Sequence, residues 1–328
     1  MDYLYSIVLY SVEIVQMTDV LSDVLNHLNL RSVRCTRLEA SGAWSLRFSL
    51  RTTLKFVAVM KGEAWLIPDE QTPVRLVEGD AFFLANAAGY VVTSDPALIP
   101  TDGLQAFDWN TGKTACLGGD DTIMLGGGFD VQGGPIDFLL KAMPPAIQIS
   151  AQDNAATALR LSLSLLNSEL EGPKVGSDAA SKSLADLMLV HALRTYALGG
   201  SFRAPTWLNG LAEPQIRQAL ELMHGNPERV WSVAELACAV GMSRSSFARS
   251  FSEKVGQPPL GYLTQWRLER ACATLRRGVE PMSNIAQAAG YGSESAFGLA
   301  FKRHFGISPG RYRKDHVAMD HVAAVIGT

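Results

Sequence analysis

The C-terminal third of the chain contains one pattern twice: SVAELACAVGMSRSSFARSFSEKVGQPP at residues 232–259 and PMSNIAQAAGYGSESAFGLAFKRHFGISP at residues 281–309. Matching residues lie 49 positions apart as far as the first glycine. Beyond it they lie 50 positions apart, because Gly292 adds one residue to the turn. The later matches are Phe247 with Phe297, Phe251 with Phe301, Gly256 with Gly306, and Tyr262 with Tyr312. Residues 213–314 are therefore predicted to contain two copies of one supersecondary unit.

Each copy has the pattern of a helix, a glycine turn and a second helix. In the first copy, Ser232 and Glu235 have the spacing of a capping box, and Gly241 stands where the first helix must end. Ser243 begins the second helix, which buries phenylalanines on one face and leaves the other face polar. Two such helices form a helix-turn-helix, whose second helix fits the major groove of DNA. A helix over residues 260–277 joins the copies and, if rigid, separates them by about one DNA turn, roughly 34 Å.

The residues before this repeat predict an all-β unit followed by helices. Short apolar runs at 54–60, 64–67, 74–77 and 81–84 alternate with turn residues between positions 33 and 150, which is typical of a sandwich or barrel. We expect the run Gly126-Gly127-Gly128 in a loop. Residues 151–200 have helical spacing and predict a hairpin with apolar stripes. These stripes either only pack on the barrel or also form a dimer seam. The stripe residues are Leu159, Leu163, Leu166 and Leu170 in the first helix, and Leu184, Leu187, Met188, His191, Ala192 and Tyr196 in the second.

Composition limits the class of protein. The chain has 328 residues, which corresponds to about two domains, and no run of about 18 apolar residues that would predict a transmembrane helix. Its four cysteines are far apart and suit a reducing cytoplasm. Residues 1–201 have 14 Lys/Arg and 22 Asp/Glu, a net charge of −8, whereas residues 202–328 have 15 and 10, a net charge of +5. The basic end favours a polyanionic partner, and a random imbalance of surface charge is the alternative.

The C-terminal region resembles the AraC-type transcription regulators. The resemblance rests on Ala237, Gly241, Ser243, Phe247, Arg249, Phe251, Gly256, Tyr262, Arg267, Ala271, Leu275, Ile285, Ala286, Gly290, Tyr291, Phe297, Phe301, Lys302, Gly306, Pro309, Tyr312 and Arg313. The N-terminal region is similar to a cupin sensor domain, on the segments 62–65, 74–76 and 78–80.

This resemblance implies a multidomain α+β fold. We expect an N-terminal cupin-like β-barrel with a helical hairpin, and a C-terminal all-α domain with two helix-turn-helix units. The predicted segments are an extension at 1–32, with a true start at Met17 as a hypothesis, a sensor domain at 33–150, a dimerising hairpin at 151–200, a linker at 201–212, a DNA-binding domain at 213–314 and a tail at 315–328.

The resemblance also implies which residues meet DNA. The base-contact candidates are Ser245, Ala248 and Arg249 in the first unit, and Ser295, Gly298 and Leu299 in the second. Arg249 is the leading candidate, because a guanidinium can bond both O6 and N7 of guanine, and a phosphate contact is its alternative. The second unit is expected to read bases poorly and mainly to hold the DNA backbone. The backbone candidates are Arg244, Lys254, Arg267, Lys302, Arg303, Arg311 and Arg313.

We therefore expect a cytoplasmic regulator that forms a homodimer and binds double-stranded promoter DNA. RNA polymerase and an unidentified small-molecule effector are the further expected partners. An effector pocket is predicted around Trp44, Phe56, Trp65 and Phe82, and filling of the core is the alternative. Lys55 and Arg47 lie on predicted strands, where each either pairs with an anion or points into solvent.

Two alternatives remain: a barrel that only dimerises, and a cupin enzyme fused to a DNA-binding unit. The enzyme is disfavoured because residues 33–150 contain no histidine, so we predict no catalytic residue, metal or cofactor. His224 is expected to be a surface histidine near a helix end. Cys238 and Cys272 are expected on buried helix faces.

Overall fold

A computed structural model describes residues 19–28, 30–49, 54–69, 71–85, 88–108, 113–131, 136–153, 156–172, 174–199 and 204–316. Among these residues no helix is long and apolar enough to cross a membrane. The hypothetical start at Met17, the beginning of the predicted linker and the end of the predicted tail lie outside the described residues.

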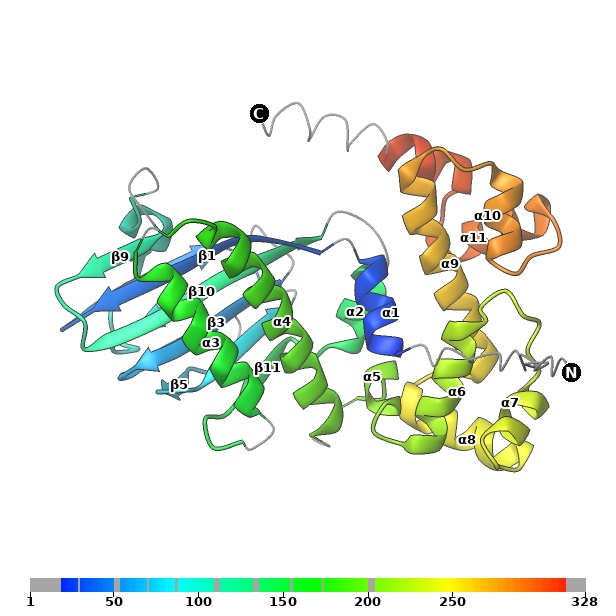
Figure 1. Cartoon of the computed structure of the whole chain (residues 1–328), viewed down its shortest axis with the longest axis horizontal. Helices are drawn as coiled ribbons and strands as arrows, with labels where there is room; N and C mark the ends of the chain where they lie inside the picture. Colours follow the sequence, from blue (N-terminus) through cyan, green and yellow to red (C-terminus); the bar gives the residue numbers. More distant parts are fainter. Residues whose placement is uncertain are drawn as a thin grey trace, which may run out of the picture.

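Two sheets form the N-terminal part of the molecule (Figure 1). The strands are β1 (Leu30–Ala40), β2 (Ser45–Ser49), β3 (Leu54–Lys61), β4 (Glu63–Pro68), β5 (Val74–Val77), β6 (Ala81–Ala85), β7 (Gly89–Thr93), β8 (Thr101–Asp102), β9 (Thr114–Leu117), β10 (Thr122–Val131) and β11 (Ala146–Ile149). The six-stranded sheet has the order β11-β6-β3-β10-β1-β9, and the five-stranded sheet has the order β5-β4-β7-β2-β8. Apolar side chains from both sheets form the core between them, including Leu38, Val59 and Leu66.

The glycine run at 126–128 was expected in a loop, and this prediction is wrong. All three glycines lie in β10 and pair with β1 and β3. A side chain at Gly127 would collide with the ring of Phe56, because its Cβ would lie 2.2 Å from a ring carbon. Glycine at this position thus makes room for a core ring in the neighbouring strand.

Helices cover the outer face of the six-stranded sheet. They are α3 (Thr157–Leu170) and α4 (Ser177–Leu198), whereas α1 (Val20–His27) and α2 (Ile136–Ala142) lie beside the C-terminal helices (Figure 1). The helices α3 and α4 form the predicted hairpin and pack on β1, as Figure 1 shows. All four leucines of the α3 stripe are buried. On α4 the buried stripe runs through Met188 and Ala192, whereas Leu187 is exposed.

The C-terminal part is helical and contains the predicted repeat. Its helices are α5 (Trp207–Gly210), α6 (Pro214–Gly225), α7 (Val233–Ala239), α8 (Arg244–Val255), α9 (Pro259–Arg277), α10 (Met282–Ala288) and α11 (Glu294–Phe305), and residues 309–316 are also helical. The capping box of Ser232 and Glu235 is present. Gly241 and Gly290 have φ angles of +68° and +74° at matching turns. In Figure 1, α9 runs between the two helix-turn-helix units.

One hydrophobic core continues from the six-stranded sheet into the first helix-turn-helix unit. Phe138 of α2 stacks on Trp207 of α5, with ring centroids 5.5 Å apart, and also contacts the rings of Tyr262 and Trp266 on α9. The second unit has a separate core around Phe297 and Phe301. The predicted linker at 201–212 therefore contains a buried helix that its composition did not indicate.

Candidate nucleic-acid interface and effector cavity

The first recognition helix, α8, has one buried face and one exposed face. Phe247 and Phe251 point into the core with no exposed surface. Ser245 and Arg249 are exposed on the other face, and Ala248 is half-buried beside them. Among the described residues none forms a hydrogen bond or ion pair with the Arg249 guanidinium, so its donors are available to a ligand. This arrangement fits the predicted base contacts.

The matching face of α11 is less polar. Ser295 and Leu299 are exposed, and Leu299 has 73% of its surface accessible. Gly298 is half-buried, and a Cβ at this position would meet nothing within 4 Å. This face therefore exposes one hydroxyl, one apolar side chain and the backbone of Gly298.

The residues predicted to contact the DNA backbone differ in whether they already bond to other residues of the protein. Arg244, Lys302 and Arg303 are exposed. Three others have partners: Lys254 lies 2.6 Å from Glu213, Arg311 lies 3.6 Å from Asp315, and Arg313 donates to the Glu280 carbonyl at 2.8 Å.

Arg267 does not fit the predicted role. Its guanidinium donates to the carbonyls of Pro227 and Arg229, the second at 2.7 Å, and burial lowers its pKa. A Cβ at Gly290 would lie 2.9 Å from the same guanidinium carbon. Arg267 thus holds the segment before α7 against the turn of the second unit, which takes up the donors that a phosphate would need.

His224 was expected at the surface, and this prediction is wrong. Its side chain is fully buried and stacks on Trp266 at 4.3 Å. Nδ1 lies 2.7 Å from Oδ2 of Asp23 on α1, and Nε2 lies 2.6 Å from the Tyr262 hydroxyl. A neutral ring with its proton on Nδ1 donates to Asp23 and accepts from Tyr262, so both hydrogen bonds form while the buried ring stays uncharged. We call Asp23, His224 and Tyr262 the interdomain triad, because it joins α1 to α6 and α9.

The cysteines follow the expectation only in part. Cys272 is buried, but Cys238 is exposed. Among the described residues, no group of three or more His, Cys, Asp or Glu side chains is placed to hold a metal ion.

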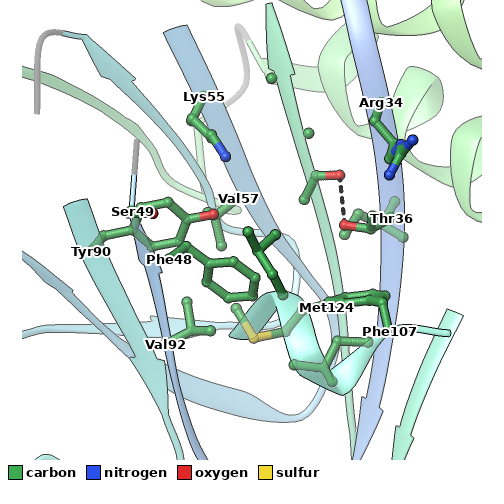
Figure 2. Close-up of a pocket in the computed structure, with 16 residues that line it drawn as sticks. Arg34, Thr36, Phe48, Ser49, Lys55, Val57, Tyr90, Val92, Phe107 and Met124 are labelled. Atoms are coloured by element: carbon green, nitrogen blue, oxygen red, sulfur yellow. Dashed lines mark hydrogen bonds between the residues drawn. The ribbon is translucent and has the colours of Figure 1, made fainter. Parts of the chain in front are cut away.

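A cavity of about 480 Å³ lies between the two sheets (Figure 2). Its walls are mainly apolar, and the polar exceptions are Arg34, Thr36, Ser49, Lys55 and Tyr90. Its apolar lining is Leu38, Phe48, Val57, Val92, Leu104, Phe107, Met124 and Leu125, with backbone from Gly126, Gly127 and Gly128. A space of this size is within the usual range for sites that bind small molecules.

The four aromatic residues predicted for the pocket do not line this cavity. Phe56 points to the opposite face of its strand, because side chains alternate and its neighbours Lys55 and Val57 face the cavity. Phe82 fills the core between the sheets, and Trp44 lines a separate hollow. Trp65 is half-buried on β4. The alternation of side chains along the strand could have indicated the true lining, because it places Lys55 and Phe56 on opposite faces of the sheet.

Comparisons with known proteins agree with this architecture. The sequence model of a cupin family matches residues 19–197, and that of a helix-turn-helix domain matches residues 236–315. A protein of Streptomyces antibioticus that is described as an AraC-like transcription regulator is 39% identical over 298 residues, which cover 90% of this chain and 98% of the relative. This chain belongs to the AraC-like transcription regulators.

Other relatives of this AraC-like regulator have related descriptions. The HTH-type transcriptional regulator AlkR of Acinetobacter baylyi is 28% identical over 305 residues, which cover 90% of this chain and 99% of AlkR. Among solved structures, the DNA-binding domain of AdpA in complex with a target DNA is 27% identical and covers 31% of this chain and 92% of that domain, with a TM-score of 0.30. The predicted resemblance, the fold class and the function as a DNA-binding transcription regulator are thus confirmed. These relatives are named as regulators, in agreement with the expectation of a regulator rather than an enzyme.

Proposed function

We propose that this AraC-like regulator recognises specific promoter sites mainly with α8 and holds the DNA backbone with α11. The observation that carries the proposal is the contrast between the two exposed faces. Arg249 and Ser245 offer donors for base edges on α8, whereas the α11 face offers mainly Leu299 and the cations Lys302 and Arg303. Arg244 joins the proposed backbone contacts, and Arg267 is left out because the protein occupies its donors.

The test is a genome-wide DNA pull-down with the purified full chain at about 150 mM salt, followed by sequencing. We expect sharp enrichment at a few intergenic sites, which gives the operator sequence. The Arg249→Ala variant, run in parallel, should lose this enrichment. Uniform enrichment that disappears with added salt would contradict specific recognition, because purely electrostatic binding behaves in this way.

We further propose that the cavity between the sheets binds a small-molecule effector. Support comes from its position: β1 lines the cavity with Arg34, Thr36 and Leu38, and the same strand follows directly after α1. Because Asp23 on α1 is bonded to His224, a shift of β1 on ligand binding would reach the DNA-binding domain. Contact with RNA polymerase stays a prediction.

The hairpin of α3 and α4 is the proposed homodimer surface. Leu161 and Leu165 are one turn apart on α3 and have 63% and 59% of their surface exposed. On α4, Leu187 and Leu198 are exposed and, at eleven residues apart, share a face of the helix. Exposed leucines in two adjacent helices are costly in water and fit a second copy of the same surface.

A further inference from the structure

Two cationic side chains stand in one row across the six-stranded sheet. Lys55 on β3 and Arg34 on β1 both pair with Gly128 on β10, which lies between them. Since neighbouring strands are about 4.8 Å apart, the two Cα atoms are separated by about 10 Å. Both side chains line the cavity, and Gly128 contributes only backbone there. The row therefore has a positive charge at each side and no side chain in the middle.

The next rows along the sheet are less polar. Val57, Gly126 and Thr36 form the second row, and Thr36 donates its hydroxyl proton to the Gly126 carbonyl at 3.2 Å. The third row brings Met124 and Leu38 to the cavity. The cavity lining thus changes from cationic to apolar along the strand direction. This change would match a ligand with a charged head and an apolar body.

The facing wall is aromatic and aliphatic. Phe48 stacks on Tyr90 with ring centroids 5.3 Å apart, and Val92 and Phe107 continue the wall. Figure 2 shows the side chains of Lys55 and Tyr90 on one side of the cavity and that of Arg34 on the other. The lining includes no acidic side chain.

Lys55 has no counter-ion in the described part of the chain. None of those residues accepts a hydrogen bond from its ammonium, although the side chain is half-buried. Burial lowers the pKa of Lys55, and it raises the pKa of Tyr90, which stays a neutral donor. A partly desolvated ammonium without a counter-ion is costly, and a bound anion would remove that cost.

We propose that the cavity binds an organic monocarboxylate with an apolar body. The carboxylate lies between Lys55 and Arg34, and the body packs against Phe48, Val92 and Met124. An amine does not fit, because the lining offers it no carboxylate. A sugar does not fit, because the walls offer few hydrogen-bonding groups for its hydroxyls. This inference rests on the effector role proposed above and gives that effector a chemical class.

The first experiment is isothermal titration of the full chain with octanoate, octan-1-ol and octylamine, which share one apolar body. We expect octanoate to bind about tenfold more tightly than octanol, because a charge-assisted bond is lost in the alcohol, and octylamine not to bind. Equal binding of octanol, or any tighter binding of octylamine, would overturn the proposal.

Variants then locate the site. Lys55→Met keeps the aliphatic length and should weaken octanoate about tenfold, whereas Lys55→Arg should retain most of the affinity. Lys61→Met is the matched control, because Lys61 lies on the same strand but is exposed and pairs with Asp120. Gly126→Val fills the floor of the cavity and should abolish binding of octanoate and octanol alike. Unchanged octanoate affinity in both Lys55→Met and Gly126→Val would place the ligand elsewhere and refute the inference.

Affinity for an operator fragment, measured with and without octanoate, distinguishes the ligand class from the effector role. Lys55-dependent binding of octanoate that leaves the operator affinity unchanged would support the ligand class and refute the effector role. Specific operator binding by a chain that takes up no octanoate would refute the ligand class and leave recognition of DNA intact.

Discussion

Arg249 illustrates how one side chain combines two possible roles on DNA. It is exposed on α8 beside Ser245, on the face opposite the buried phenylalanines. A guanidinium at this position can read a guanine edge or neutralise a phosphate, and the two roles have different signatures.

For Arg249→Ala we expect a loss of about 1–3 kcal/mol in operator binding and relaxed specificity at one base pair. Lys302→Ala, on α11, should weaken all DNA sequences about equally and reduce the slope of log affinity against log salt by about one. Fluorescence anisotropy with a panel of single-base operator variants checks both. A uniform loss over all sequences for Arg249→Ala would reassign this residue to the DNA backbone.

Two glycines, one in each helix-turn-helix unit, have opposite conformational requirements. Gly298 lies inside α11 with open space around it, whereas Gly241 has a φ of +68° at the turn of the first unit and also has nothing within 4 Å of an added Cβ. Space is thus equal at the two positions, and only the backbone conformation differs.

Gly298→Ala should therefore raise the free energy of unfolding by about 0.5–1 kcal/mol, from helix propensity. Gly241→Ala should lower it by about 1–2 kcal/mol, because an L side chain disfavours the left-handed region. Chemical denaturation of both variants measures the difference. Equal effects of the same sign would show that conformation does not decide these two positions.

At the scale of elements, the helices α3 and α4 have two different faces. Their inner faces complete the core against the sheet, and Leu163, Leu166 and Met188 are fully buried there. Their outer face carries exposed leucines, and packing on the barrel does not explain those. The α3 stripe that the sequence indicated thus packs on the sheet, and the proposed dimer surface is a different face of the same hairpin.

The double substitution Leu161→Glu with Leu165→Glu should convert a dimer into monomers, because it places charges at the centre of an apolar surface. Sedimentation equilibrium measures the change. The matched control is Val230→Glu with Val279→Glu, since these valines are also strongly exposed, at 84% and 83%, but lie outside the hairpin. A dimer that survives the leucine changes would contradict the proposed seam.

At the scale of the whole molecule, the division into cores does not follow the division into domains. The core of the six-stranded sheet continues through Phe138 and Trp207 into the first helix-turn-helix unit, whereas the second unit has its own core. The long helix α9 contributes Trp266 to the first core and Leu275 to the second. The second unit thus packs around a core of its own.

Phe138→Ala should lower the free energy of unfolding by about 3–5 kcal/mol, the usual cost of removing a buried aromatic ring. In hydrogen exchange, amides of α6 and of the sheet should lose protection, and those of α11 should keep it. Phe301→Ala, in the second core, is the matched variant and should show the reverse. Equal loss over the whole chain in both variants would contradict two separate cores.

The interdomain triad gives stability a pH dependence. Burial lowers the pKa of His224 below its ordinary 6.5, so the unfolded chain binds the proton more readily. The stabilisation that comes from the neutral, buried His224 is complete above pH 6.5 and is lost as the pH falls toward the lowered pKa of the folded state. Burial alone would raise the pKa of Asp23, but hydrogen bonds from His224 and His27 lower it, so the stabilisation from the ionised Asp23 is lost only below pH 3.8. His27 and Arg270 are the other charged groups that act on His224.

Between pH 7.5 and 5.5 the wild type should therefore lose more stability than His224→Asn, in which no ring titrates. Thermal unfolding of both proteins at the two pH values measures this difference. A loss of stability in the variant that is the same at both pH values does not affect the comparison. An equal pH dependence would show that His224 does not titrate over this range.

Local patterns predict the C-terminal domain, whereas the sites between elements depend on how the whole chain folds. The repeat, the Ser232 capping box and the glycine turns act within a few residues of one another, so local rules predict both helix-turn-helix units. The true lining of the cavity depends on which strands lie side by side: Lys55 and Arg34 line the same cavity only because β3 and β1 both pair with β10. Likewise, Asp23 and His224 are 201 residues apart. Strand order and domain contact follow from burial of the whole chain, and no local pattern encodes them.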